Sequence, residues 1–342
     1  MVYFVDDLNS YRKQIDEADE GIIKLIKKRF DIVKAVGEFK KEQGIPLKDN
    51  SREDALKIKW KQIAEQNGID GELGLSVITD ILKFSKEEEM PKNNSRLLII
   101  GYGNMGIAIA GYFLKHNFEN VYLTGRHVDD NKDKIYSIKG IPISNPNPKD
   151  FDTIIITTPP ESVNSDLVEN ILSESKGKLV MDIFSVKKEA YQKLLDYSKK
   201  YEFEYVSVHP LFGPTQLTDS NKIAVITDRV DEKVLTEAEN MWSYAGFTTI
   251  KSNLEEHEKS MAIVQVLRII DFVAMKNSIE ELKKSLNVDY SKLSTVSFAE
   301  VEKLINNISG DYSLIKEILD SNTYSNEVLN NLIKNVENLK YE

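Results

Sequence analysis

The chain has 342 residues, of which 45 are Lys or Arg, 55 are Asp or Glu, and none is Cys. This length predicts two or three domains, and the 41% apolar and 29% charged residues are typical of a soluble globular protein. The net charge of −10 argues against a general binder of nucleic acids or anionic membranes. Without Cys and with four His, disulfides and thiolate sites are excluded and no metal site is expected. No run approaches the roughly 20 apolar residues of a membrane span, so we expect a cytoplasmic protein.

The first 90 residues are predicted to be helical. Apolar residues recur at helical spacing from Leu8 to about Gln43, which predicts a helix roughly 54 Å long. Such a helix is longer than a small domain is wide, so we expect it to pack against a second chain. A second helix is predicted from Ser51, and a third from about Leu75 to Glu89 after a break at 67–74.

From residue 96 the pattern changes to short apolar runs with helical segments between several of them. The predicted strands are 96–100, 121–124, 153–157, 178–184, 205–208 and 223–227. Alternation of strands and helices predicts a parallel α/β sheet. From about Asn253 to the end, the chain is again predicted to be mostly helical.

Charged residues recur along the predicted N-terminal helices. Arg29 and Lys40 are 11 residues apart, which places them about 20° apart around a helix, whereas Arg12 lies roughly 100° from Arg29 and faces elsewhere, toward a partner chain. Together with polar groups on the second and third predicted helices, these cations form a set suited to bind a small dianion. The alternative is a collection of surface salt bridges and solvated cationic side chains. The further polar groups are Asp49, Arg52 and Glu53 on the second helix and Ser85 and Glu89 on the third.

The segment YRKQIDEADEGIIKLIKKRFDIVKAVGEFKKEQGIPLKDNSRE, residues 11–53, resembles an all-helical chorismate mutase. The resemblance implies that Arg29 and, from a partner subunit, Arg12 hold the two carboxylates of chorismate. It also implies that Lys40 and Glu89 bond to the ether oxygen. This reaction is pericyclic, so the site needs to hold the folded conformer and to stabilise charge on the ether oxygen. The residues implied to contact the hydroxyl, position the cations or complete the pocket are Asp49, Arg52, Glu53 and Ser85.

A glycine-rich fingerprint follows the strand predicted at 96–100. The G-x-G-x-x-G spacing of Gly101, Gly103 and Gly106 allows a tight turn, close approach of the backbone to a pyrophosphate, and tight helix packing. The alternative is a purely structural turn. About twenty residues further on, Thr124-Gly125-Arg126 replaces the expected acid, which favours a 2′-phosphate and therefore NADP over NAD. The other residues expected at the cofactor are Tyr102, Asn104, Met105, Thr157, Thr158 and Pro159.

Two further segments, DIFSVK at 182–187 and VHPLFGP at 208–214, are predicted at strand ends. His209 is a candidate acid/base or hydrogen-bonding group, although a single His can equally be structural. These segments resemble the D-x-x-S-V-K and H-P-M-F-G-P patterns of prephenate dehydrogenase. The segment EHEKSMAIVQVLR at 256–268 resembles a stretch of the mutase-fused enzymes. The resemblance implies that His209 accepts a hydrogen bond from the ring hydroxyl of prephenate and that Ser185 orients it. The other implied substrate-binding residues are Lys187, Gln265 and Arg268.

With the mutase-like segment in front, the whole chain resembles the bifunctional chorismate mutase/prephenate dehydrogenases of the T-protein type. The resemblance implies tyrosine biosynthesis from chorismate through prephenate to 4-hydroxyphenylpyruvate, with hydride transfer to NADP or NAD. The negative net charge and the lack of a long apolar run predict no nucleic-acid or membrane partner. The expected architecture is an all-α chorismate mutase-type domain at 1–92, an α/β Rossmann-type dinucleotide-binding domain at 93–252, and an all-α substrate and dimerisation domain at 253–342. We expect a homodimer.

Two departures from the family pattern keep alternatives open. Ile269 stands where the family usually has His, and the family's carboxylate-binding Arg falls near Asn306, with no Arg after Arg268. Arg268 or Lys303 is then expected to take over the carboxylate, or the substrate is arogenate. A further alternative makes the helical half only a regulatory or oligomerisation module. A generic 3-hydroxyacid or imine reductase is disfavoured by the segments at 182–187 and 208–214.

Overall fold

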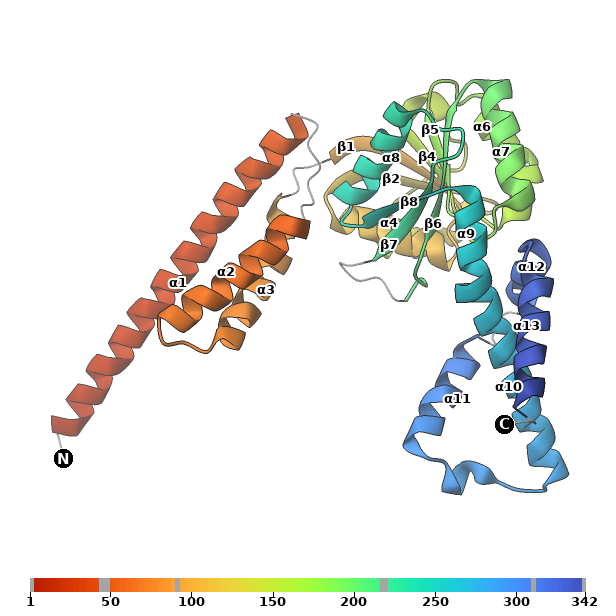
Figure 1. The fold of residues 1–342 in the computed structure, drawn as a ribbon. Coiled ribbons are helices and arrows are strands. Elements are labelled where there is room, and N and C mark those ends of the chain that lie inside the picture. The colour runs from red at the N-terminus through yellow and green to blue at the C-terminus, as the bar shows by residue number, and fades with distance from the viewer. Residues whose placement is uncertain (1–2, 43–49, 90–92, 216–220, 309–311, 340–342) are drawn as a thin grey trace.

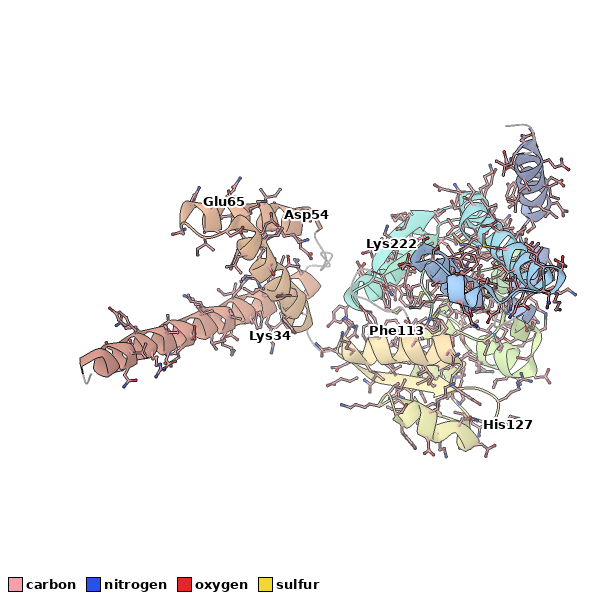
Figure 2. The ribbon with its side chains drawn as sticks, turned by 90° about the horizontal axis from the view of Figure 1, so that it is seen from below. Lys34, Asp54, Glu65, Phe113, His127 and Lys222 are labelled. Atoms are coloured by element: carbon pink, nitrogen blue, oxygen red, sulfur yellow. The ribbon has the colours of Figure 1, made fainter. Side chains whose placement is uncertain are left out.

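The computed structural model describes residues 3–42, 50–89, 93–215, 221–308 and 312–339. The N-terminal region consists of three helices, α1 (Tyr3–Glu42), α2 (Asn50–Gln66) and α3 (Gly71–Glu89), set apart from the sheet in Figure 1. α3 packs against both α1 and α2. Figure 2 shows that the N-terminal part of α1 extends beyond these two helices. The long first helix predicted from the apolar spacing is therefore present.

The third helix begins earlier than predicted, at Gly71 rather than near Leu75. Asp70 Oδ1 accepts a hydrogen bond from the backbone N–H of Glu72 at 2.8 Å, which satisfies one of the free donors at the helix start. Gly74 lies inside the helix, where a Cβ would be 2.7 Å from Ala64 Cβ. The glycine that suggested a break therefore allows α2 and α3 to approach closely.

The middle region is one eight-stranded sheet with the order β3-β2-β1-β4-β5-β6-β7-β8. The six predicted strands are present, and two short strands, β3 and β8, were not predicted. The strands are β1 (Asn93–Ile100), β2 (Phe118–Thr124), β3 (Ile141–Pro142), β4 (Thr153–Ile156), β5 (Leu179–Asp182), β6 (Glu204–Pro210), β7 (Lys222–Ile226) and β8 (Thr248–Ser252). The helices that accompany them are α4 (Asn104–Lys115), α5 (Lys132–Tyr136), α6 (Asp166–Ser173), α7 (Lys188–Tyr201) and α8 (Glu232–Tyr244).

The sheet is parallel except at one pair, β6 and β7, which run antiparallel. The expectation of a parallel sheet was wrong there. A parallel connection needs a crossover of a dozen or more residues, usually a helix, whereas only residues 211–221 join these two strands. The chain therefore turns back on itself after β6, which places Pro210 opposite Ile223.

The register of the parallel strands aligns their carboxyl ends. Ile100 of β1 pairs with Ile156 of β4, Ile156 pairs with Asp182 of β5, and Asp182 pairs with Ser207 of β6. The glycine-rich turn, the segment after β4, the DIFSVK segment and the end of β6 thus share one edge of the sheet. Ligands bind at this edge in open α/β sheets.

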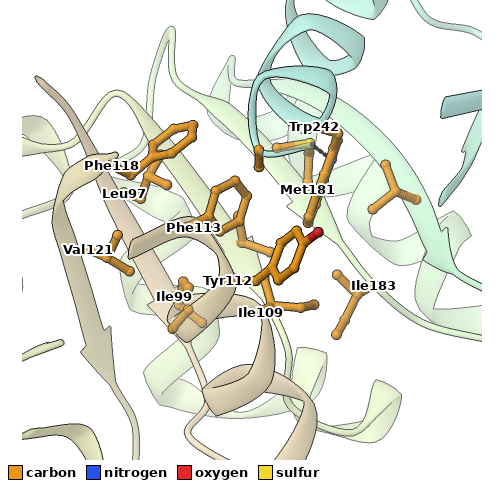
Figure 3. Close-up of a cluster of buried hydrophobic side chains, with 14 of the residues drawn as sticks. Leu97, Ile99, Ile109, Tyr112, Phe113, Phe118, Val121, Met181, Ile183 and Trp242 are labelled. Carbon is orange, nitrogen blue, oxygen red and sulfur yellow. Dashed lines mark hydrogen bonds between the residues drawn. The ribbon is translucent and has the colours of Figure 1, made fainter. Parts of the chain in front are cut away.

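An apolar core fixes the helix that follows the glycine-rich turn. Phe113 of α4 is fully buried and packs on the ring of Trp242 from α8, with ring centroids 5.1 Å apart (Figure 3). The indole N–H of Trp242 donates to Met181 Sδ of β5 at 3.3 Å. α4 is therefore packed on α8, which is in turn bonded to β5 of the sheet.

The C-terminal region is helical. A short buried cluster joins it to the sheet, because Val186 of the loop after β5 packs with Val266, Ile269, Ile315 and Ile318. Ile269, the departure from the family pattern, is thus a core residue. No helix in the described part of the chain is long and apolar enough to cross a membrane. The elements are α9 (Leu254–Met261), a π-helical turn (Ala262–Leu267), α10 (Arg268–Ser285), α11 (Val296–Ile308), α12 (Tyr312–Ser321) and α13 (Ser325–Asn338).

Candidate active sites

The helical region brings two of its predicted site residues into direct contact. Arg29 of α1 donates a hydrogen bond from Nη1 to Ser85 Oγ of α3. Ser85 is only 3% exposed, and its hydroxyl donates to the carbonyl of Ile81 at 2.5 Å. Because the Ser85 proton is used within α3, its oxygen is left to accept from the guanidinium. Lys40 and Glu53 are half-buried, whereas Arg52 is exposed.

Arg12 lies far from this cluster within one chain. It is exposed and precedes Arg29 by 17 positions on one continuous helix, which corresponds to about 26 Å along the axis. Asp49 lies outside the described residues. Glu89 is the last residue of α3, and its side chain is likewise outside the description. The structure thus joins Arg29 and Ser85 and leaves Arg12 apart from them.

The glycine-rich turn has the shape that a dinucleotide needs. Gly101 has a φ of +116°, and a Cβ on Gly106 would lie 2.4 Å from the Gly101 carbonyl oxygen. A Cβ on Gly103 would meet nothing within 4 Å, so the space in front of this backbone is open. Helix α4 starts here with no side-chain hydrogen bond from its N-cap, Gly103. Free N–H groups at a helix N-terminus suit a pyrophosphate.

Side chains from neighbouring segments hold this turn and the loop after β2. Thr157 Oγ1 lies 3.1 Å from the carbonyl oxygen of Ile100 and 3.0 Å from that of Gly101. The Tyr102 hydroxyl donates to the carbonyl oxygen of Arg126. Arg126 itself is exposed, as is His127 beside it, which Figure 2 shows at the surface of the α/β region. The exposed Arg126 side chain therefore lies in the loop after β2, where the adenine ribose of a dinucleotide is expected.

A buried ion pair lies below the end of β6. Lys187 and Asp182 are both 0% exposed, and Lys187 Nζ lies 3.0 Å from Asp182 Oδ1. The ammonium also donates to the carbonyl of Val208 at 2.6 Å. Asp182 accepts further hydrogen bonds from the Tyr205 hydroxyl at 2.6 Å and from the backbone N–H of Phe184 at 2.8 Å. Burial lowers the pKa of Lys187, while Asp182 opposes that shift.

This position differs from the one expected for Lys187. A substrate-binding Lys should reach an accessible space, but its ammonium is enclosed and already bound to Asp182 and Val208. The expected placement of Lys187 is therefore wrong. Its bonds to Asp182 and Val208 connect the loop after β5 to the end of β6. It thereby fixes the strand that carries His209.

His209 forms a pair with a second His. Its Nδ1 lies 2.9 Å from Nε2 of His257, which comes from α9, and the two side chains are 5% and 2% exposed. Burial holds the pKa of His209 well below 6.5, and the neighbouring Lys187 and His257 lower it further. His209 is therefore neutral at neutral pH. A neutral imidazole has one nitrogen that can accept a proton or a hydrogen bond.

The remaining predicted substrate contacts come from the loop after β5, the π-helical turn and the helices that follow it. Ser185 is half-buried in the loop after β5, three residues past the position that pairs with Ser207 of β6. Gln265 is half-buried in the π-helical turn, and Arg268 is exposed at the start of α10. The side chains of Lys303 and Asn306 on α11 are exposed.

Both halves of the chain match known protein families. Residues 11–90 match the family Chorismate mutase type II, and residues 110–251 match the nucleotide-binding domain of prephenate dehydrogenase. The T-protein of Haemophilus influenzae is 25% identical over 301 residues, 83% of this chain and 73% of that protein. The chain belongs to the bifunctional chorismate mutase/prephenate dehydrogenases. The chorismate mutase of Methanocaldococcus jannaschii is 30% identical over 82 residues, 24% of this chain and 83% of that protein.

Solved structures support the fold of the dehydrogenase half of this family member. Prephenate dehydrogenase from A. aeolicus, in complex with hydroxyphenyl propionate and NAD+, superposes with a TM-score of 0.57 at 19% identity, covering 73% of this chain and 90% of that chain. Synechocystis arogenate dehydrogenase gives a TM-score of 0.55 at 15% identity, covering 72% and 91%. The expected fold, a helical mutase-type region followed by an α/β dehydrogenase and further helices, is thereby confirmed.

Two residues at the dehydrogenase site were not predicted as site residues. His257 is 48 positions from its partner His209, so no local spacing connects them. Asp182 was part of a recognised segment but was not assigned a role. The available signal was compositional: two of only four His lie in the segments that resemble the family. The domain boundaries remain a prediction.

Proposed function

We propose that this chain catalyses two consecutive steps of tyrosine biosynthesis, chorismate to prephenate and prephenate to 4-hydroxyphenylpyruvate. The observation that carries the proposal is the presence, in one chain of this family, of two sites suited to the same molecule. One is the Arg29–Ser85 contact on the helices, and the other is neutral His209 at the sheet edge that bears the glycine-rich turn.

In the mutase half, catalysis comes from holding chorismate in its folded conformer. The Arg29 guanidinium, oriented by Ser85, grips one carboxylate bidentately. Lys40 and Glu89 act at the ether oxygen, and Lys40 offsets the negative charge that grows there as the bond breaks. Asp49, Arg52 and Glu53 complete the pocket.

The second carboxylate of chorismate is assigned to Arg12 of a second copy in a homodimer. Within one chain Arg12 is about 26 Å along the helix from Arg29, so it cannot serve the same pocket. The exposed apolar side chains of α1 support this assembly, because contiguous exposed apolar surface marks interfaces. They are Leu8, Tyr11, Ile15, Ile22, Ile23, Leu25, Ile32, Val36 and Phe39.

In the dehydrogenase half, the accepting nitrogen of His209 takes the proton of the prephenate ring hydroxyl. The hydrogen on ring C4 leaves as hydride, and the resulting ring ketone loses CO₂. The electrons of the broken C–C bond enter the ring, and the oxygen regains a proton from His209 to give the phenol. Ser185 orients the hydroxyl, while Gln265 and Arg268 contact the rest of the substrate.

The glycine-rich turn fits a nicotinamide dinucleotide, which supplies the hydride acceptor when bound. The open space at Gly103 and the uncapped start of α4 would hold its pyrophosphate. The Tyr102 hydroxyl donates to the Arg126 carbonyl and so holds the loop that carries Arg126. The Arg126 side chain would bind a 2′-phosphate, so we propose NADP in preference to NAD. We also propose a cytoplasmic location.

The test is to supply purified protein with chorismate and either NADP or NAD, and to follow reduced cofactor and released CO₂. Reduction that depends on chorismate would support both halves at once. Prephenate and arogenate are then supplied separately. Reduction with prephenate but not with chorismate would contradict the mutase assignment, and reduction with arogenate alone would contradict the substrate assignment.

A further inference from the structure

The two buried imidazoles His209 and His257 share one hydrogen bond. Their facing nitrogens are 2.9 Å apart, and the rings meet edge to face with centroids 5.1 Å apart and planes at 72°. Between two imidazole nitrogens at this distance, one must donate and the other accept. The location of this single proton decides which nitrogen of His209 is left to act on a substrate.

The charged groups around the pair favour one of the two arrangements. Glu258 Oε1 lies 3.9 Å from Nδ1 of His257, whereas no hydrogen-bond acceptor reaches that nitrogen among the described residues. A nearby carboxylate favours a proton on the nitrogen that faces it. His257 then carries its proton on Nδ1 and presents the lone pair of Nε2 to His209.

A buried cation near His209 affects the charge of that imidazole and not the choice of tautomer. Lys187 is bound to Asp182 and to the carbonyl of Val208, the residue before His209. Its positive charge opposes a second positive charge on the imidazole. His209 is thereby held neutral, with one proton to place on one of its two nitrogens.

We propose that His257 is a positioning residue that fixes the tautomer of His209. By accepting a hydrogen bond at Nε2, His257 keeps the His209 proton on Nδ1 and leaves Nε2 of His209 as the nitrogen that takes the substrate proton. This inference rests on the proposed dehydrogenase function. In the opposite tautomer, Nε2 of His209 would carry a proton and could not accept one.

Two variants of His257 separate this role from packing. In His257→Gln, the side-chain oxygen reaches the position of Nε2 and can still accept the hydrogen bond, whereas His257→Leu fills similar space without an acceptor. We expect kcat for prephenate oxidation to fall about 100-fold in His257→Leu and less than about tenfold in His257→Gln, with little change in KM for the dinucleotide. Urea unfolding of the same samples, followed by the fluorescence of Trp242 in the sheet core, controls for folding of the dehydrogenase half.

Nitrogen NMR of protein labelled at the His rings reads the tautomer directly. The chain has four His, so four ring systems are observed, and His209→Asn identifies the signals of His209. We expect wild-type His209 to carry its proton on Nδ1, the His257→Gln variant to keep it there, and His257→Leu to move it toward Nε2. His116→Gln is the matched control, because His116 is also buried but bonds to the carbonyl of Tyr112 on α4. It should leave the His209 signals unchanged.

Each outcome bears on the proposal. A wild-type spectrum with the His209 proton on Nε2, or equal losses of kcat in folded His257→Leu and His257→Gln, would overturn it. The NMR measurement needs no turnover. Wild-type protein that fails to oxidise prephenate would therefore contradict the dehydrogenase function while leaving the tautomer assignment to be judged separately.

Discussion

The two candidate sites are built in opposite ways. At the sheet edge, Lys187, Asp182 and His209 are all at most 5% exposed, and their hydrogen bonds join β5, the loop after it, β6 and α9. On the helices, Arg29 is only half-buried, and Arg12 faces solvent about 26 Å along the same helix. The residues at the sheet edge are enclosed by elements of their own region, whereas the site on the long helix depends on what packs against that helix.

This difference predicts that the two activities can be lost independently. The sheet site is held by a core that includes fully buried Phe113 and Trp242, with no contact to α1 required. The helical site is held by α3 packing on α1 and α2. Substitutions in one site should therefore leave the other active, and five experiments test how far this separation extends.

The largest effect is expected from His209→Asn. The substitution removes the nitrogen that takes the substrate proton, and groups of this kind contribute about 10²–10⁴-fold to rate. We expect prephenate oxidation to fall by about 1,000-fold, while conversion of chorismate to prephenate, followed by absorbance, stays unchanged. A matching loss of mutase activity would show that the two sites are coupled.

Lys187→Met tests the buried ion pair. Removing one partner leaves the Asp182 carboxylate buried without its cation, which typically costs about 3–5 kcal/mol. Urea unfolding should show this loss, and the double variant Asp182→Asn/Lys187→Met should recover much of it. The matched control is Lys61→Met in the helical region, because the Lys61–Glu72 pair has exposed side chains, 45% and 68%. It should change unfolding little, since exposed pairs contribute little. An equal effect at both positions would contradict the contrast.

The sequence predicted the positions of most strands, but not the direction of every strand or the short strands at the sheet edges. Short apolar runs identified six strands because buried parallel strands are apolar on both faces. The strand β8 was missed because TTIKS has neither an apolar run nor a buried side chain. The antiparallel β7 was identified as a strand but with the wrong direction, since periodicity within a strand carries no information about its neighbour.

Site residues were predictable where a local segment carried them. The glycine spacing located the dinucleotide turn, and the strand-end position located His209. Lys187 was recognised but misplaced, because the segment shows that a Lys is present and not that its ammonium turns inward to Asp182. The contact to His257 depends on how α9 packs against β6, which sequence spacing cannot give.

Arg29→Ala should affect only the helical site. The substitution removes a charge-assisted contact to a chorismate carboxylate and leaves buried Ser85 without its donor. We expect mutase kcat/KM to fall about 100-fold, with prephenate oxidation unchanged when prephenate is supplied directly. Lys34→Ala, on the same helix with an exposed side chain, is the control. Loss of dehydrogenase activity in Arg29→Ala would argue that the helices serve the second site as well.

Arg126→Ala tests the cofactor preference at the exposed border of the sheet site. If Arg126 binds a 2′-phosphate, its loss should lower kcat/KM for NADP about tenfold and leave NAD nearly unaffected, because one exposed charge contact has a modest effect. The ratio of the two kcat/KM values is the readout. His127→Ala at the neighbouring position shows whether the effect is specific. Equal values for NADP and NAD in the unchanged protein would contradict the preference.

The smallest expected effect is a change in the free energy of unfolding at mildly acid pH, caused by the buried His209. Burial, with Lys187 and His257 nearby, holds the pKa of His209 well below 6.5 in the folded protein, whereas the unfolded chain takes up this proton near pH 6.5. Between these two pKa values the unfolded state binds more protons, so the free energy of unfolding falls as the pH is lowered. One such group contributes about 1 kcal/mol between pH 6.5 and 5.5. Urea unfolding of His209→Gln should lack this part of the decline, and an identical pH dependence in both proteins would show that His209 is not the group responsible.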